Sequence, residues 1–303
     1  MKPRTRNILL ASIGLLGVAY ATLIRGASEP SDCTFDLDLA KLRAAAASLP
    51  GEKPGELRVE HLTTFHMPEA VVVTGGRWGL TDMEVYAYQL VFPDRTIIVD
   101  TAMNEALAKE MMGADYDATA WTRLERAMRA ASEIYVTHEH ADHLGGLTSI
   151  LSSTAAIARA RLTREQLDHP ERLEPGKIPD AVKAQLKPLE YEGLRAVAPG
   201  VVLVKAPGHT PGSQLVFIAL STGKEILLTG DTAWHVENID RVVGPPRLVT
   251  YLGLNNDRGA NSCQLAAIRA LGIADPKVGI MPGHDAPRMK ELQKQGFIER
   301  GFR

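Results

Sequence analysis

Residues 137–143 read T-H-E-H-A-D-H and come directly after an apolar, strand-like run. At an extended strand end, side chains two positions apart lie on the same side, so His138 and His140 can reach one metal ion. Asp142 and His143 are neighbours that point apart, which suits them to a second ion. The glycine pair and the apolar residues that follow predict a helix, and the dipole at its N-terminus favours a carboxylate at Asp142.

Three further apolar runs are typical of β-strands, and each ends in a glycine turn followed by a metal-type side chain. Their turns read P-G-H-T at 207–210, T-G-D at 229–231 and M-P-G-H-D at 281–285. A lone H-x-H would be explained by a solvated, histidine-rich loop. Four strand ends that together deliver five histidines and two aspartates favour a metal centre instead.

In this order, the four motifs resemble those of the metallo-β-lactamase-fold hydrolases over about residues 58–290. The resemblance implies an α/β fold, the αβ/βα sandwich of two facing mixed β-sheets flanked by helices. It implies a dinuclear site in which one ion is held by His138, His140 and His209. The second ion would be held by Asp142, His143 and His284, with Asp231 bridging both.

Such a site predicts metal-dependent hydrolysis. Two divalent ions, two carboxylates and a bridging hydroxide sum to a formal charge of about +1, which leaves the metals electrophilic. The hydroxide would attack the substrate, and Asp142 would carry a proton to the leaving group. Zn²⁺ suits the mixed nitrogen and oxygen ligands best, with iron or manganese as alternatives. Oxygen-reducing di-iron relatives carry a glutamate where His140 stands, which disfavours redox chemistry.

The motifs are closest to the lactonase branch of the family, which includes acyl-homoserine lactonases, so an ester or lactone substrate is expected. Those enzymes have a tyrosine three residues after the bridging aspartate, where this chain has Trp234, which donates only through its indole nitrogen. His235 is a catalytic candidate because it follows at the mouth of the same loop. The alternatives are a phosphoester, phosphotriester or thioester hydrolase, and less favoured ones are a β-lactamase or a non-catalytic envelope metal-binding module.

Two residues outside the ligand motifs are also candidates. Trp78 lies among glycines at 75–79, which predicts a mobile flap that binds substrate, although an ordinary turn with a packed tryptophan explains the pattern almost as well. Trp234 is the second predicted substrate-binding residue. Asp100 ends an apolar strand and either supports the metal loop or caps a turn.

Residues 1–27 predict a signal peptide or an N-terminal membrane anchor. Three basic residues precede the uncharged stretch 8–24, which is at the short limit for a membrane span. The sequence A-Y-A at 19–21 fits a cleavage site, so both alternatives stay open. Either one predicts export of the rest of the chain, which would be periplasmic or extracellular, or anchored by residues 8–24.

Residues 28–56 are expected to form a linker with one short helix, and 57–303 the catalytic domain. Expected strands in its first part are 57–63, 70–74, 85–92 and 96–99, and expected helices include 104–112, 118–131 and 262–271. Cys33 and Cys263 could form a disulfide in an exported protein, although Cys263 is also typical of a small buried residue in a helix.

The chain has 303 residues, of which 45% are hydrophobic, enough for one large α/β domain with an N-terminal extension. Its formal net charge is −2, and no basic run follows the N-terminal segment. We therefore expect a small-molecule substrate and no nucleic-acid partner, with the membrane reached through the N-terminal segment alone. The sequence does not indicate an oligomeric state.

Overall fold

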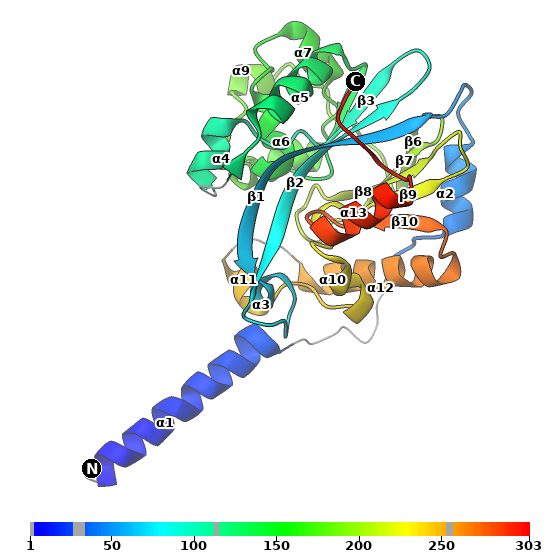
Figure 1. The fold of residues 1–303 in the computed structure, drawn as a ribbon. Coiled ribbons are helices and arrows are strands. Elements are labelled where there is room, and N and C mark those ends of the chain that lie inside the picture. The colour runs from blue at the N-terminus through cyan, green and yellow to red at the C-terminus, as the bar shows by residue number, and fades with distance from the viewer. Residues whose placement is uncertain (1–2, 27–33, 112–114, 253–256) are drawn as a thin grey trace.

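The computed structural model describes residues 3–26, 34–111, 115–252 and 257–303. Two β-sheets lie face to face, and helices cover the outer face of each (Figure 1). Both sheets contain parallel and antiparallel neighbours, so both are mixed. The predicted αβ/βα sandwich is confirmed.

The first sheet has six strands in the order β11-β1-β2-β3-β5, with β4 paired to β1. β1 and β2 form a long antiparallel hairpin that extends beyond the other strands. The strands are β1 (Glu56–Pro68), β2 (Leu80–Val91), β3 (Thr96–Val99), β4 (Asp115–Tyr116), β5 (Glu133–Tyr135) and β11 (Glu299–Arg300).

The second sheet has five strands in the order β10-β9-β8-β7-β6. Strands β6 to β9 pair with antiparallel neighbours, and β10 is parallel to β9. The strands are β6 (Leu194–Ala198), β7 (Val201–Lys205), β8 (Gln214–Ala219), β9 (Glu225–Leu228) and β10 (Val278–Met281).

Strand β2 shows how the layers are built. Successive side chains of a strand point to opposite faces of the sheet. Val85 and Ala87 pack against the helices on the outer face, whereas Tyr86 and Tyr88 join the core between the two sheets. A strand buried on both faces has an almost continuous apolar sequence, as residues 85–91 of β2 do, with Gln89 as the one polar residue.

Helices on the first sheet share its outer core, which includes Leu124 and Leu144. They are α4 (Glu105–Met111), α5 (Ala118–Ala130), α6 (Ala141–Thr148), α7 (Thr154–Arg159), α8 (Arg164–Asp168) and α9 (Asp180–Lys183), with the 3₁₀ turn η2 (Pro170–Arg172). The second sheet is covered by α2 (Leu39–Ala46), α10 (Val236–Arg241) and α12 (Arg258–Ala274), and α13 (Ala286–Lys294) packs beside β10. The short elements η3 (Gly230–Thr232) and α11 (Arg247–Tyr251) complete this half.

Two expectations for the first hundred residues need correction. The apolar run 70–74 is not a strand, because the amide groups of Glu69 and Ala70 bond to carbonyls at the end of the hairpin and start the short helix α3 (Glu69–Val72). The helix expected in 28–56 is present as α2, but Leu42 and Ala46 pack into the outer core of the second sheet. This part of the segment belongs to the folded domain and is more than a linker.

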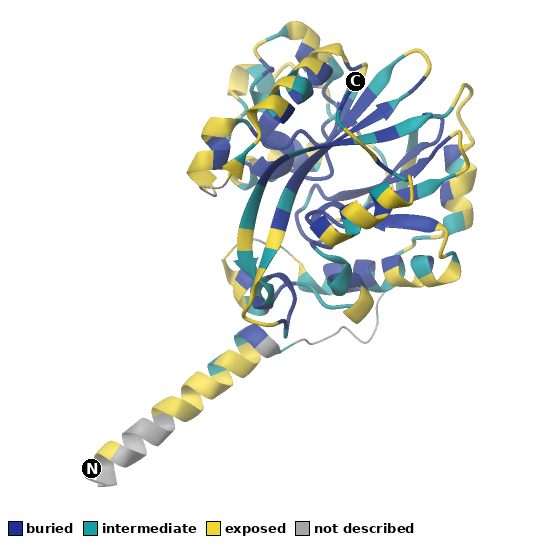
Figure 2. Ribbon diagram, viewed as in Figure 1, coloured by how far each residue is buried: buried dark blue, intermediate teal, exposed yellow. Residues whose placement is uncertain are grey.

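The N-terminal helix α1 (Pro3–Tyr20) continues as the π-helix η1 (Ala21–Arg25) and projects away from the domain (Figures 1 and 2). Among the residues that the structure describes, no helix combines the length and the apolar character that crossing a bilayer requires. Cys263 is half-buried and disulfide-bonded, so it is not the simple buried residue expected, and Cys33 lies outside the described residues.

Candidate metal centre

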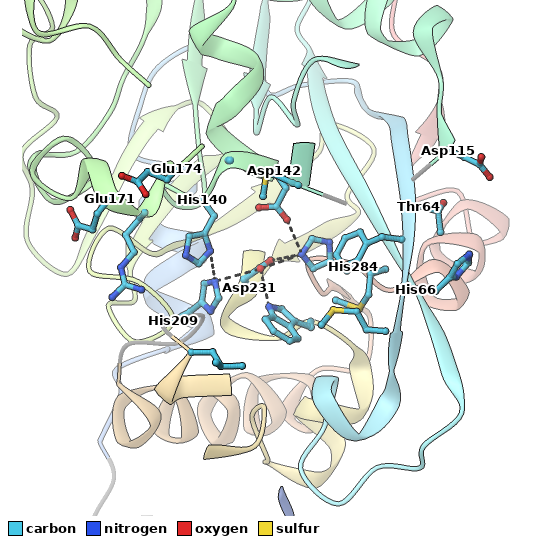
Figure 3. Close-up of a pocket in the computed structure, with 18 residues that line it drawn as sticks. Thr64, His66, Asp115, His140, Asp142, Glu171, Glu174, His209, Asp231 and His284 are labelled. Atoms are coloured by element: carbon cyan, nitrogen blue, oxygen red, sulfur yellow. Dashed lines mark hydrogen bonds and ion pairs between the residues drawn. The ribbon is translucent and has the colours of Figure 1, made fainter. Parts of the chain in front are cut away.

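The seven predicted ligands converge at one edge of the two sheets. Each follows the end of a strand: β5 leads to the histidine-rich loop and α6, β7 to His209, β9 to Asp231 and β10 to His284. Figure 3 shows side chains from these loops pointing toward one another at the base of a cavity. Two groups of potential ligand atoms result, and Asp231 belongs to both.

The first group consists of three histidine nitrogens and one carboxylate oxygen. Nδ1 of His140 lies 3.1 Å from Nε2 of His138 and 3.0 Å from Nε2 of His209. Oδ2 of Asp231 is 3.8 and 3.5 Å from those two Nε2 atoms. Tetrahedral ligands of one zinc ion are separated by about 3.4 Å, so this group has the dimensions of a metal site.

The second group has two histidines and two carboxylates. Nε2 of His143 and Nε2 of His284 each lie 3.2 Å from Oδ1 of Asp231. Oδ2 of Asp142 is 3.7 Å from His143 and 3.5 Å from His284. As expected, Asp142 lies in the first turn of α6, where the helix dipole favours its charge.

Hydrogen bonds fix the orientation of the second group. The carboxylate of Asp100 accepts a bond of 2.9 Å from Nδ1 of His143, and it also accepts from the amide and hydroxyl of Thr137. Nδ1 of His284 donates to the backbone carbonyl of Glu84 at 2.9 Å. With Nδ1 engaged, Nε2 of both rings is left to face the cavity, as metal-binding histidines require. Asp100 thus supports the metal loop, the first of its two predicted roles.

A second buried carboxylate holds the other side of the histidine-rich loop. Glu139, between the two histidines of the H-x-H motif, accepts bonds from the hydroxyl of Thr210 and the amide of Gly212. Burial raises the pKa of Glu139, and these donors oppose that shift. The link ties the His138 loop to the His209 loop. No sequence motif predicts this link, although the P-G-H-T motif supplies one of the donors.

Glycine is required where the loops approach most closely. A Cβ atom at Gly283 would overlap Oδ1 of Asp231, and one at Gly146 would overlap the carbonyl oxygen of Thr101. The first contact lets the turn after β10 bring His284 next to the bridging carboxylate. The second lets α6 pack directly against the segment after β3, which carries Asp100.

The electrostatics differ between the two groups. Burial lowers the pKa of His138 and of His209 and lowers that of His140 to about 4, so these rings are neutral. Burial also acts to lower the pKa of His143 and of His284, but the surrounding carboxylates outweigh it and both values are raised. Burial opposes ionisation of Asp231, but the neighbouring histidines hold its pKa well below the usual range.

The residues fit a pair of metal ions. Among the described residues, Nε2 of His143 and Oδ1 of Asp231 are buried without a hydrogen-bond partner. Buried polar atoms normally have partners, and these two face each other across the second group. A cation between them would satisfy both. The seven side chains would hold two ions, with Asp231 shared.

A cavity of about 1000 Å³ opens above the ligands. In Figure 3, Glu171 and Glu174 lie on one side of it and Thr64, His66 and Asp115 on the other. The lining consists of Thr64, Phe65, His66, Met67, Met83, Met111, Asp115, His140, Ala141, Asp142, Glu171, Arg172, Glu174, His209, Asp231, Trp234, Leu252 and His284.

The three remaining candidates lie in different places. Trp234 lines the cavity and donates from Nε1 to Oδ2 of Asp231 at 2.8 Å. His235 precedes α10, and its Nε2 lies 3.1 Å from the carbonyl oxygen of Asp82, outside the lining. Trp78 is at the hairpin end, exposed and bonded to Tyr20. The structure therefore does not place His235 or Trp78 where they could act on a substrate in the cavity.

Sequence reasoning also missed most of the cavity wall. Phe65, Met67 and Met83 come from the β1–β2 hairpin, and Glu171 and Arg172 from η2. These residues stand far from the ligand motifs in the chain and carry no local signature. The pairing of β1 with β2, together with the hydrogen bonds between Glu84 and His284, brings the hairpin over the metal centre.

A family model described as the metallo-beta-lactamase superfamily matches residues 80–284, which include all seven ligands. The chain belongs to this superfamily. The resemblance deduced from the four motifs is therefore confirmed. Together with the ligand set, membership confirms the prediction of a metal-dependent hydrolase.

The relatives found by sequence are lactonases. An N-acyl homoserine lactonase of Bacillus sp. is 28% identical over 180 residues, which cover 54% of this chain and 70% of the relative. An N-acyl homoserine lactonase of Bacillus thuringiensis is 27% identical over 181 residues, 53% of this chain and 68% of that one.

Solved structures show the same fold. A quorum-quenching N-acyl homoserine lactone lactonase superposes with a TM-score of 0.63 at 21% identity, over 80% of this chain and 97% of that chain. AidC, described as a dizinc quorum-quenching lactonase, superposes with a TM-score of 0.54 at 17% identity, over 77% and 89%. At these identities the structural likeness establishes the fold alone.

Proposed function

We propose that the protein is a dinuclear hydrolase that opens the ring of lactones carrying an acyl chain. The observation that carries the proposal is the seven-ligand cluster centred on Asp231 at the floor of a cavity with an apolar wall. The curated relatives, which are N-acyl homoserine lactonases, support the same bond type. Zn²⁺ is the proposed metal, because nitrogen and oxygen ligands at tetrahedral spacing suit it best.

The cavity has distinct parts for the two ends of such a substrate. Phe65, Met67 and Met83 form an apolar wall beside the metal centre, suited to an acyl chain. His140, Asp142 and Asp231 form the polar floor, where a lactone carbonyl would lie. A cavity of about 1000 Å³ has room for both parts.

Two bound metal ions would supply an activated water and polarise the carbonyl oxygen. The protein's own groups perform the remaining tasks. Asp142 lines the cavity and can take a proton from the attacking water and pass it to the leaving ring oxygen. Trp234 holds Oδ2 of Asp231 through its indole nitrogen, so it orients the shared ligand. This contact occupies the indole N–H, the only side-chain donor of Trp234.

A substrate panel tests the proposal. The metal-loaded protein would be assayed with acyl-homoserine lactones, simple lactones, thioesters, phosphodiesters, phosphotriesters and a β-lactam. We expect the highest kcat/KM for an acylated lactone. A kcat/KM higher for a phosphotriester or thioester than for every lactone would replace the proposal with one of those activities. If no substrate were hydrolysed, we would conclude that the protein is a non-catalytic metal-binding module.

We also propose that the domain acts outside the cytoplasm, because a basic N-terminal end followed by an apolar segment is typical of export. A reporter enzyme active only after export, fused after Arg303, should be active. Activity of a second reporter, one that functions only in the cytoplasm and is fused at the same position, would overturn this proposal. The proposal on substrate would not be affected.

A further inference from the structure

One end of the domain carries exposed, large apolar side chains. Trp78 and Leu80 at the hairpin end are 57% and 71% exposed, and Tyr251 and Leu252 at the end of α11 are 73% and 68% exposed. We call these four residues the apolar rim. Clustered apolar residues on a surface mark an interaction site more often than scattered ones do.

The apolar rim continues into the N-terminal helix. The indole nitrogen of Trp78 donates to the hydroxyl of Tyr20 at 3.4 Å, and the two ring centroids are 6.4 Å apart. The turn η1 that follows contacts α11. Figure 1 shows the end of α1 beside α3 and α11, so helix and rim form one apolar surface.

The shape of this surface selects a lipid partner. Ile13, Leu15, Leu16 and Val18 are all exposed, and at 100° per residue they lie on more than one side of this part of α1 (Figure 2). A groove on another protein would cover one side of such a helix. The headgroup and hydrocarbon boundary of a bilayer can cover several sides at once, which suits a helix that lies in that boundary.

Charge and aromatic content point to an anionic bilayer. Up to Ser28 the chain contains Lys2 and three arginines but no Asp or Glu. Basic residues next to an apolar helix attract anionic lipid headgroups. Trp78, Tyr20 and Tyr251 have amphipathic rings of the kind that gather at the boundary between headgroups and hydrocarbon.

We infer that α1 and the apolar rim dock on an anionic bilayer and place the mouth of the cavity at the lipid surface, so that the substrates are long-chain lactones taken from the membrane. Leu252 belongs both to the rim and to the cavity lining. Met67, also in the lining, is one pair along the hairpin from Leu80, since Pro68 pairs with Leu80 and Met67 with Thr81. The part of this inference that concerns substrate rests on the proposed lactonase activity.

The docking is tested with the full chain on vesicles of phosphatidylglycerol and phosphatidylcholine that contain brominated lipids. Bromine quenches tryptophan fluorescence within the hydrocarbon region. We expect quenching of the wild type and its loss in Trp78→Phe, because Trp121 and Trp234 lie within the domain. Equal quenching in the two proteins, or none in either, would overturn the docking of the rim.

The route of the substrate is tested with the double variant Leu80→Ser/Tyr251→Ser. We expect roughly tenfold slower hydrolysis of a long-chain lactone presented in vesicles, since two apolar anchors are lost. Hydrolysis of a short-chain, water-soluble lactone should not change. The matched control is Ile273→Ser, a residue 65% exposed near the end of α12, which Figure 1 shows away from α1.

The two experiments separate failure of the docking from failure of the activity. If the wild type hydrolyses neither lactone but Trp78 is quenched by brominated lipid, the proposed function fails and the docking stands. If both lactones are hydrolysed and the double variant slows neither, the membrane route is overturned while the lactonase proposal stands. Dimers in sedimentation without vesicles, together with unquenched Trp78, would assign the rim to a second copy of the chain and overturn the docking.

Discussion

The indole nitrogen of Trp234 donates a hydrogen bond of 2.8 Å to Oδ2 of Asp231, while Oδ1 of the same carboxylate faces His143 and His284. Oδ2 lies near the three-histidine group and is also 3.2 Å from Nε2 of His284, so Asp231 contacts both ligand groups and Trp234 restrains the oxygen that reaches the first. The resemblance to the lactonases leads us to expect a tyrosine that contacts the substrate at this position. This chain has Trp234 there instead, and its indole orients a metal ligand.

Removing only the indole donor tests this contact. Trp234→Phe keeps an aromatic ring of similar shape but leaves Oδ2 without its donor, so we predict metal binding roughly 10- to 100-fold weaker. Chelator competition measures the metal dissociation constants directly. Trp121→Phe is the matched control, because Trp121 packs on the helix side of the first sheet, remote from the ligands. Unchanged metal affinity in Trp234→Phe would show that the contact does not position Asp231.

Asp100 should affect metal binding, because its carboxylate orients the ring of His143. Asp100→Asn retains the shape but offers one acceptor oxygen where the carboxylate offers two, and it lacks the negative charge that holds the Nδ1–H of His143. We predict a 10- to 100-fold loss of metal affinity at the second group. The control is Asp117→Asn, which replaces the N-cap residue of α5 with an equally good cap. Equal metal affinities in the two variants would contradict the supporting role.

The ligands could be predicted from sequence because each one lies in a loop or a helix start that follows a strand, and strand ends meet at one edge of the sheets. The sequence does not indicate in this way where a residue far from a strand end will lie. Trp78 has the glycine neighbours of a flap, yet the length of the β1–β2 hairpin carries it past the cavity to Tyr20. His235 is one residue from Trp234, but the start of α10 turns its ring toward Asp82.

His235 is close to Asp231 in the sequence, but its ring lies outside the cavity, so its removal tests which of the two decides its role. Because its ring contacts the backbone of Asp82 outside the cavity, His235→Ala should keep both metals and a kcat/KM within about twofold of the wild type. Steady-state kinetics with the best lactone would measure this. A loss of turnover with both metals retained would instead return His235 to the catalytic role expected from the sequence.

The two ligand groups should respond differently to pH. The raised pKa values of His143 and His284 mean that protons occupy these rings in the metal-free protein up to a pH above the ordinary histidine value of about 6.5. A metal must displace those protons, so affinity at the second group should rise with pH, by about tenfold per unit for each proton released.

The three-histidine group should lack this dependence near neutral pH, because its rings are already neutral, with the pKa of His140 at about 4. Zinc titrations of the metal-free protein at pH 6 and pH 8 compare the two groups. We expect one tight site at both pH values and a second that tightens at pH 8. Two sites with the same pH dependence would contradict the assignment of charge to the groups.

Asp142 and Asp231 should differ in the kind of defect that their loss produces. Asp231→Asn removes the charge that both groups share, so metal content should fall at both sites. Asp142→Asn removes a ligand of the second group only and also the group that carries the proton. We therefore predict that Asp142→Asn retains more metal yet lowers kcat by about 10²- to 10⁴-fold, the usual contribution of general acid–base catalysis.

Metal analysis of both variants, followed by kinetics at saturating zinc, separates these effects. Saturating metal should restore part of the activity of Asp231→Asn, since its defect is mainly in binding. It should not restore Asp142→Asn, because the amide of asparagine cannot take up and release the proton that the carboxylate would carry. If excess zinc restored Asp142→Asn to wild-type kcat, Asp142 would be a ligand alone, and the proton would leave by another route.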